Sequence, residues 1–284
     1  SVKWKVPLSD EGVRGELGLS DDTDLRIGLT VLWKGFPLER TQVTAKWAAL
    51  TAVVENDAFS TNEGWTAVQR DAAWSHTVNH LRHAERQLVL HVARTMTTDA
   101  VALAMLRRFA LDELKGEKRK AALDDVAAAV LTCPLYDSNR GRVSLQTIVD
   151  SAQKYALVRT TQVSLLNGLD VPKELVVLVA PANDKTGAEA VLGETAKEAR
   201  AWLWVHQKLT ALRALPEQKC ELPLGKWFST PVETADGRGV AGVSEGSDLA
   251  QATVEVLLGQ RLVHAEHRPA LSPFWGVLEL AGDV

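Results

Sequence analysis

The residues with the most suggestive chemistry are three histidines, His76, His80 and His83, at positions i, i+4 and i+7 of a segment with helical apolar spacing. This spacing places three imidazoles on one stripe of a helix, where Zn²⁺ could bind. The stripe points nearly opposite to the apolar residues, so we expect it to face water. Glu85 lies on the wrong side to support the imidazoles as a second carboxylate layer. A solvated helix face is the preferred interpretation, and a metal site is the alternative.

A second candidate is the run Asn183, Asp184, Lys185 and Thr186, which lies between an apolar run of strand length at 175–180 and an expected helix start. Anions often bind at such a place. The run lacks the glycine order of a phosphate loop, and a capping box formed by Thr186 and Glu189 explains it as a helix start. An enzyme, either a hydrolase or metal-dependent, with its site here or at the three histidines is therefore the alternative function.

Two further patterns predict no chemistry. Gly237, Gly239 and Gly242 match the dinucleotide-binding glycine pattern, but neither a buried strand before them nor a helix start after them is expected. Cys133 and Cys220 are too few for a disulfide framework or a zinc cluster, and neither has an adjacent base. The sequence therefore predicts no catalytic, cofactor-binding or metal-binding residues, and no cofactor.

The composition is that of a soluble globular protein: 284 residues, 46% hydrophobic, 24% charged, with a formal net charge of −4. This charge disfavours nucleic acid and anionic membranes as main partners. The basic cluster from Lys115 to Lys120 lacks the interleaved aromatic residues that base stacking needs. With no apolar run long enough to span a bilayer and no signal-peptide pattern, a cytoplasmic location is predicted.

An internal repeat predicts how the chain is organised. Residues 1–60 align without a gap onto residues 225–284 at a constant offset of 224, with eleven identical positions. The match is densest where RGELGLSDDTDL, from Arg14, lies over RGVAGVSEGSDL, from Arg238. For the shared Arg14 and Asp24, a cross-strand ion pair and an aspartate that closes its own turn are preferred over a reused ligand contact.

The repeated unit has the alternating apolar pattern of β-strands, at about 13–19, 25–33, 36–43 and 50–54, and predicts a small antiparallel meander. Apolar helical spacing follows at 64–94, 101–114 and 121–131. Ser144 is expected to cap a short helix, and a longer helix is expected from Thr186 to about Leu215. The predicted class is α+β, with a β module at each end flanking a helical segment and a small α/β module. The expected segments are 1–63, 64–131, 132–215 and 216–284, the last containing a linker and the second β module.

The order of these segments resembles a known family. A β module with RGELGL and a Lys-Gly turn, then VVENDAFSTNEGW leading into helices, then PLYDSNRGRVSL opening an α/β module, is similar to the region downstream of the ATP-binding domain in large bacterial Hsp90-like (GHKL-type) proteins. The ATP-binding motifs of that family do not occur in this chain, so the resemblance transfers no catalytic residue. It implies a role in relaying conformational change and in contacting other proteins.

The leading hypothesis is a non-enzymatic interaction or transducer scaffold, a fragment of a larger repeat-containing bacterial protein for which the resemblance implies a link to an Hsp90-like ATPase. The chain starts at Ser1, and the second copy stops at Val284, aligned with a point just before the helices of the first, so we expect the intact chain to continue. The expected partners are other protein domains, in the first instance of the same longer chain. Under this hypothesis the two β modules should superpose, and no pocket should gather titratable groups.

Overall fold

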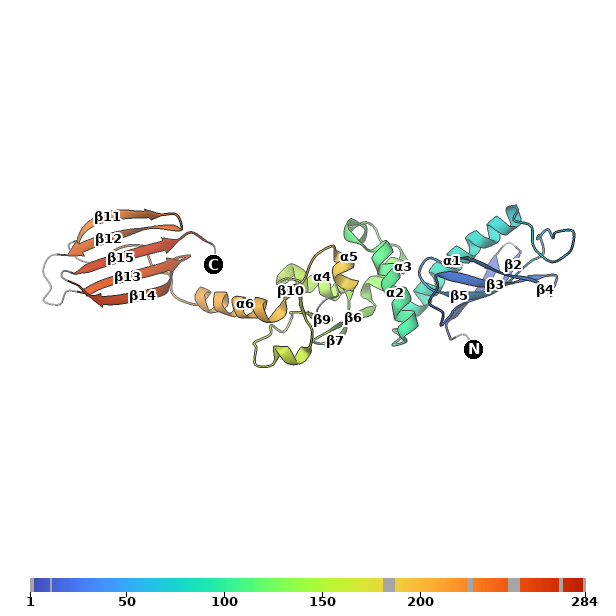
Figure 1. Ribbon diagram of the computed structural model, residues 1–284, viewed down its shortest axis with the longest axis horizontal. Coiled ribbons are helices and arrows are strands. Elements are labelled where there is room, and N and C mark those ends of the chain that lie inside the picture. The colour runs from blue at the N-terminus through green and yellow to red at the C-terminus, as the bar shows by residue number, and fades with distance from the viewer. Residues whose placement is uncertain are drawn as a thin grey trace. The chain divides into compact units, whose positions relative to one another are not determined.

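The computed structural model describes residues 3–10, 12–180, 187–223, 227–244, 251–270 and 273–282. Within them the chain forms six α-helices and three five-stranded sheets, which confirms the predicted α+β class (Figure 1). The chain divides into two compact units, Ser1–Arg200 and Ala201–Val284. The segments expected at 1–63 and 64–131 and most of the segment at 132–215 share one hydrophobic core, so in the structure they make a single unit.

The first sheet has the strand order β1-β2-β5-β3-β4. Its strands are β1 (Lys5–Asp10), β2 (Val13–Leu19), β3 (Arg26–Trp33), β4 (Phe36–Thr44) and β5 (Leu50–Asn56). The prediction of an antiparallel meander is wrong, because β5 lies between β2 and β3 and pairs with β3 in parallel. β1, which contains Pro7, takes an edge where a missing N–H is tolerated.

Helices and a second sheet complete the first unit. The helices are α1 (Ala72–Arg94), α2 (Ala100–Glu113), α3 (Asp125–Thr132), α4 (Leu145–Lys154) and α5 (Gly187–Leu192), with a 3₁₀ turn at Gly116–Lys120. The sheet has the order β10-β8-β9-β6-β7, formed by β6 (Pro134–Ser138), β7 (Gly141–Ser144), β8 (Val158–Thr160), β9 (Val177–Val179) and β10 (Lys197–Glu198). Ser144 caps α4 by accepting a hydrogen bond from the Thr147 backbone N–H, as predicted.

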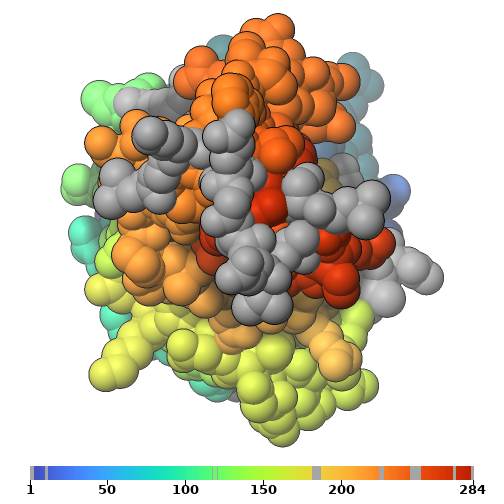
Figure 2. Space-filling model, turned by 90° about the vertical axis from the view of Figure 1, so that its left-hand side faces the viewer, coloured from blue at the N-terminus to red at the C-terminus, as the bar shows by residue number. Residues whose placement is uncertain are grey.

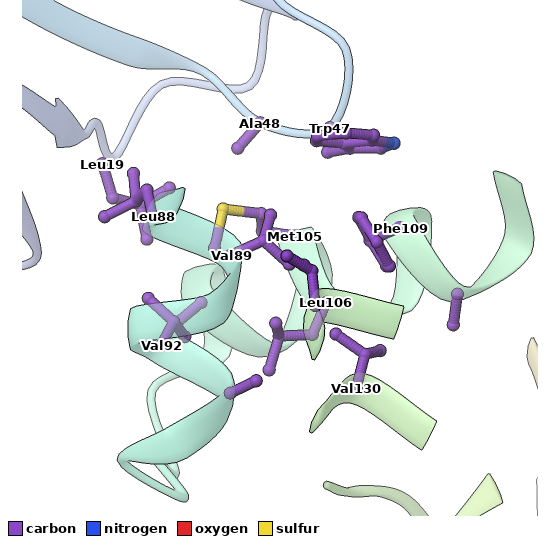
Figure 3. Close-up of a cluster of buried hydrophobic side chains, with 14 of the residues drawn as sticks. Leu19, Trp47, Ala48, Leu88, Val89, Val92, Met105, Leu106, Phe109 and Val130 are labelled. Carbon is purple, nitrogen blue, oxygen red and sulfur yellow. The ribbon is translucent and has the colours of Figure 1, made fainter. Parts of the chain in front are cut away.

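Buried apolar side chains join the first sheet to the helices. Leu88 of α1 lies beside Leu19 of β2, Val89 of α1 lies beside Met105 of α2, and Trp47, from the loop between β4 and β5, lies above Phe109 (Figure 3). The Trp47 and Phe109 ring centroids are 4.8 Å apart in an edge-to-face arrangement, which is a favourable aromatic geometry. This packing holds the helical layer against the sheet.

Two helix predictions need correction. The helix expected from Gly64 begins at Ala72, because the Asp71 side chain caps it there by accepting a hydrogen bond from the Trp74 N–H. The helix expected from Thr186 to Leu215 is interrupted: α5 stops at Gly193, whose φ of +73° suits glycine, and α6 (Ala199–Arg213) starts after β10. Thr186 itself lies outside the described residues. Of the helices within the described ranges, none has the length and apolarity needed to cross a membrane.

The C-terminal unit contains the third sheet, drawn in orange to red in Figures 1 and 2. Its order, β11-β12-β15-β13-β14, is that of the first sheet. The strands are β11 (Trp227–Thr234), β12 (Gly237–Ser244), β13 (Gln251–Leu258), β14 (Arg261–Pro269) and β15 (Phe274–Leu280). The prediction that both ends of the chain fold alike is therefore confirmed.

The register of the two sheets refines the alignment. The offset of 224 holds for β1, β2 and β5. Val13 pairs with Asn56 as Gly237 pairs with Leu280, and Lys5 pairs with Gly18 as Ser229 pairs with Gly242. In the β3–β4 hairpin the offset is 225, because the bulge after Val31 recurs after Val256. The structural partner of Gly35 is consequently Gln260. The constant offset of 224 predicts Gly259 as the partner of Gly35, and this prediction is wrong. Lys34 and Gly35, like Gly259 and Gln260, all have positive φ, so both hairpins use the same kind of two-residue turn.

Candidate interaction surface

The first and third sheets, which have the same fold, differ in which face they bury. In the first sheet, the face that carries Leu17, Leu29 and Val54 is buried, each side chain being at most 2% exposed. At the equivalent positions the third sheet carries Ala241, Val254 and Leu278, of which Val254 is 39% exposed and the other two are half-buried. We call this surface of the third sheet the open face. Its apolar members are Phe228, Val232, Ala241, Val243, Ala252, Val254, Val256, Leu258, Phe274, Leu278 and Leu280.

The open face has a bulky end and a shallow centre. Phe228 lies opposite Val243, and Val243 lies opposite Phe274, so these three form a row across adjacent strands. Phe228 is 71% exposed and Val243 is 40% exposed. The next row carries Ala241 and Gly276 where the first sheet carries Leu17 and Ala52. A large apolar rim beside a shallow centre can receive a ridge of side chains from another element.

In the first sheet the equivalent face is covered by α1, which packs on β1 and β2 (Figure 1). The buried stripe of α1 includes Leu81, Leu88 and Val92, each fully buried. Trp4, which aligns with Phe228, contacts His91 near the end of α1 with ring centroids 6.1 Å apart. The helix thus supplies the apolar cover that the described residues of the second unit do not supply.

Polar contacts fix α1 to the first sheet ahead of its first turn and near its middle. Ahead of the helix, the Arg70 guanidinium bonds the Glu39 carboxylate at 2.7 Å and the Thr41 hydroxyl at 3.3 Å, both on β4. Further along, Glu85 is 1% exposed and accepts the backbone N–H groups of Lys46 and Trp47, each at 2.9 Å. Burial raises the pKa of the Glu85 carboxyl, and these backbone hydrogen bonds oppose the rise. α1 therefore runs from the Glu39 end of the sheet to the Trp4 end.

The opposite face of the third sheet is covered by the segment that precedes β11. Gln218 bonds the Glu255 carboxylate at 2.7 Å, and the Cys220 thiol lies 3.7 Å from the Val277 carbonyl oxygen. Val277 is 2% exposed, whereas its identical counterpart Val53 is 44% exposed. Burial raises the pKa of the Cys220 thiol, which disfavours its nucleophilic thiolate. Each sheet therefore buries one face, and the two sheets bury opposite ones.

The structure does not assemble the histidines into a metal site. His76 and His80 are half-buried and His83 is exposed on α1, so the expectation that all three face water holds only for His83. Across the described ranges, His, Cys, Asp and Glu side chains form no group of three or more that could hold a metal ion. Glu85, expected on the other side of the helix, lies there and anchors the β4–β5 loop instead.

The remaining candidates take structural places or lie outside the description. Asn183 to Thr186 fall outside the described residues, while Glu189 accepts the Ala196 backbone N–H at 2.8 Å and pairs with Arg159. Gly237, Gly239 and Gly242 lie within β12, a strand paired on both sides, so they do not form the loop that dinucleotide binding requires.

The shared arginine makes the cross-strand pair preferred from the sequence. The Arg14 guanidinium lies 3.6 Å from Glu55 on the neighbouring strand and 2.9 Å from Asp57. Arg238 and Glu279 occupy the same opposed positions in the third sheet. Asp24 lies in the turn before β3, and its counterpart Asp248 falls outside the described residues.

The open face was not singled out from the sequence, although a signal for it exists. Phe228 aligns with Trp4 and Val243 with Leu19, so large apolar residues recur at positions that are half-buried and buried in the first copy. What the sequence lacks is the identity of the element that covers them. Comparison of the chain with protein-family models and with curated proteins gives no match.

Proposed function

We propose that this chain is an interaction scaffold that binds another polypeptide through the open face of its third sheet. The observation that carries the proposal is internal to the molecule: the same fold is present twice, and the face buried under α1 in one copy is exposed in the other. Exposed apolar side chains gathered on one surface favour a binding role, because such patches are rare on surfaces that stay in water. The transducer role implied by the Hsp90-like resemblance is the wider setting of this proposal.

The proposal is tested with the full chain and a library of random 24-residue peptides displayed on phage. Peptides selected on the native chain should bind at least tenfold more weakly to a Phe228→Glu, Val243→Glu variant, since two charges on the open face disfavour apolar contact. Both side chains are well exposed, so the variant should fold. The matched control is Val205→Glu on α6, a valine 47% exposed away from the sheet, which should leave binding unchanged.

Two outcomes would contradict the proposal. One is a selection that returns no peptide above background. The other is a set of peptides that bind the open-face variant as tightly as the native chain, which would place the binding surface elsewhere.

A further inference from the structure

The first sheet shows what kind of element covers the face that corresponds to the open face. α1 is a 23-residue helix that packs on β1 and β2, and its direction follows β2 from the Glu39 end of the sheet to the Trp4 end. In the third sheet, β11 and β12 take the places of β1 and β2, and the exposed Phe228 takes the place of Trp4. The same backbone geometry is therefore available to a helix in the same pose.

The side chains of the open face define what such a helix must carry. Ala241 replaces Leu17, and Ala252 replaces Ile27, so the face is shallower than its counterpart. A covering helix can fill this space with larger apolar side chains, because close packing without voids favours complementary sizes. A helix seated along two strands presents such side chains at positions i, i+3, i+4 and i+7.

Charge at the rim defines the orientation. In the first copy, Arg70 lies before α1 and bonds both Glu39 and Thr41 on β4. On β14 the corresponding positions hold His264 and Glu266, so the acidic residue has moved by two positions but stays within the reach that Arg70 shows. Glu266 is exposed and also pairs with the neighbouring Arg268. A basic residue ahead of the incoming helix is the complementary partner.

From these observations we infer that the occupant of the open face is an amphipathic α-helix of another polypeptide, lying along β11 and β12 in the direction of β12 and preceded by a basic residue that pairs with Glu266. The inference rests on the proposed function and specifies its partner. It commits to a helix on the face, in contrast to an extended strand added at the exposed edge strand β14.

The probe is a fluorescent peptide spanning residues 69–95 of this chain, which contains Arg70 and all of α1. It should bind the full chain, and Phe228→Glu in the protein should weaken binding at least tenfold, with Val205→Glu as the unaffected control. A second peptide carries Val78→Pro and Leu88→Pro. It should not bind, because proline is not accommodated in a helix interior and these substitutions break the helix. In the orientation that α1 has on the first sheet, the native peptide can bind only to the open face of the third sheet, because α1 already covers the first sheet.

Charge reversal tests the orientation. An Arg70→Glu peptide should bind the native chain about three- to tenfold more weakly, and Glu266→Arg in the protein should restore most of the loss. The inference is wrong if the native peptide fails to bind, if the proline peptide binds equally well, or if the reversed pair gives no recovery. If library peptides bind the open face and the α1 peptide does not, the proposed function is supported and only the inference of a helical partner is wrong.

Discussion

The first and third sheets share strand order and register yet expose opposite faces. Val53 and Val277 are the same residue at the same position, and one is 44% exposed while the other is 2% exposed. In the first sheet the cover is a helix that follows β5, and in the third it is the segment that precedes β11. The strand order thus depends on features that both copies keep, whereas the buried face depends on the flanking segment. A repeat in sequence predicts the sheet but not its interface.

The largest expected effect tests the features that both copies keep. A Cβ added at Gly15 would lie 1.9 Å from the Val53 carbonyl oxygen, and one added at Gly239 would lie 2.1 Å from the Val277 carbonyl oxygen. Neither backbone can yield without disturbing the sheet. Gly15→Ala and Gly239→Ala should each lower the free energy of unfolding by about 3 kcal/mol or more, each in its own unit, as measured by urea unfolding with hydrogen exchange to locate the loss.

Each of these variants has a matched control. A Cβ on Gly28 would lie 3.8 Å from the Leu50 carbonyl oxygen, and one on Gly276 would lie 3.5 Å from the Phe274 ring, both ordinary contacts. Gly28→Ala and Gly276→Ala should therefore change stability by less than about 1 kcal/mol. A tolerated alanine at Gly15 or at Gly239 would break the structural equivalence of the two sheets.

The anchor between α1 and the first sheet has no counterpart among the described residues of the second unit. Glu85→Ala leaves the buried N–H of Trp47 and the part-buried N–H of Lys46 without an acceptor, which should cost about 1–3 kcal/mol for each group that water does not reach. Glu85→Gln keeps an acceptor oxygen and should cost less. The free energy of unfolding, measured with urea at neutral pH, should fall in the order native, Glu85→Gln, Glu85→Ala, because the variants keep progressively fewer of these hydrogen bonds.

The pH dependence sharpens the same point. Because the folded-state pKa of Glu85 lies above its ordinary value of 4.5, the folded state binds the proton more tightly than the unfolded state. Stability from this group is therefore greatest below about pH 4.5 and declines as pH rises through the raised pKa. Glu85→Gln should remove that decline. An unchanged slope between native and Gln proteins would show that Glu85 is not the titrating group.

The next largest expected change in the free energy of unfolding concerns the equivalent valines Val53 and Val277. Val277→Ala should cost about 2 kcal/mol, because it removes buried methyl groups beneath the segment that precedes β11. Val53→Ala should change the free energy of unfolding by less than about 0.5 kcal/mol, since its side chain already contacts water. Thermal unfolding of the two full-length variants measures both values. Equal costs would mean that the two sheets do not bury opposite faces.

Much of the fold could be predicted from the sequence, because its strands alternate and its turns carry the expected residues. The strands at 13–19 and 50–54, the Ser144 cap and the folding of both ends alike are confirmed. β1 was not predicted, since Pro7 interrupts its pattern. The central place of β5 depends on pairing between distant strands, which local alternation does not encode. The one-residue shift in the hairpin was hidden by the coincidence of Gly35 and Gly259 in an ungapped alignment.

The candidate site was harder to predict than the fold. The three histidines have the helical spacing of metal ligands, yet His76 and His80 are half-buried along α1. No group of side chains that could hold a metal ion forms in the described parts of the chain. The apolar residues of the open face are ordinary in the sequence, because strands contain such residues whether or not they are covered. Exposure is a property of the assembled molecule, and it emerged only from comparing equivalent positions in three dimensions.

The smallest effect concerns a charged pair whose residues recur in both copies. Arg14 and Glu55 lie opposite each other with their charged groups 3.6 Å apart, and Arg238 and Glu279 occupy the same opposed strand positions. Because Arg14 is 60% exposed, a double-mutant cycle to alanine should give a coupling of about 0.2–1 kcal/mol at low salt that fades at high salt. Lys5 with Glu16, an exposed pair without a repeated counterpart, is the reference. A coupling near zero in both repeats, with the reference pair still coupled, would remove the ion pair as the reason for the shared residues and favour the ligand contact instead.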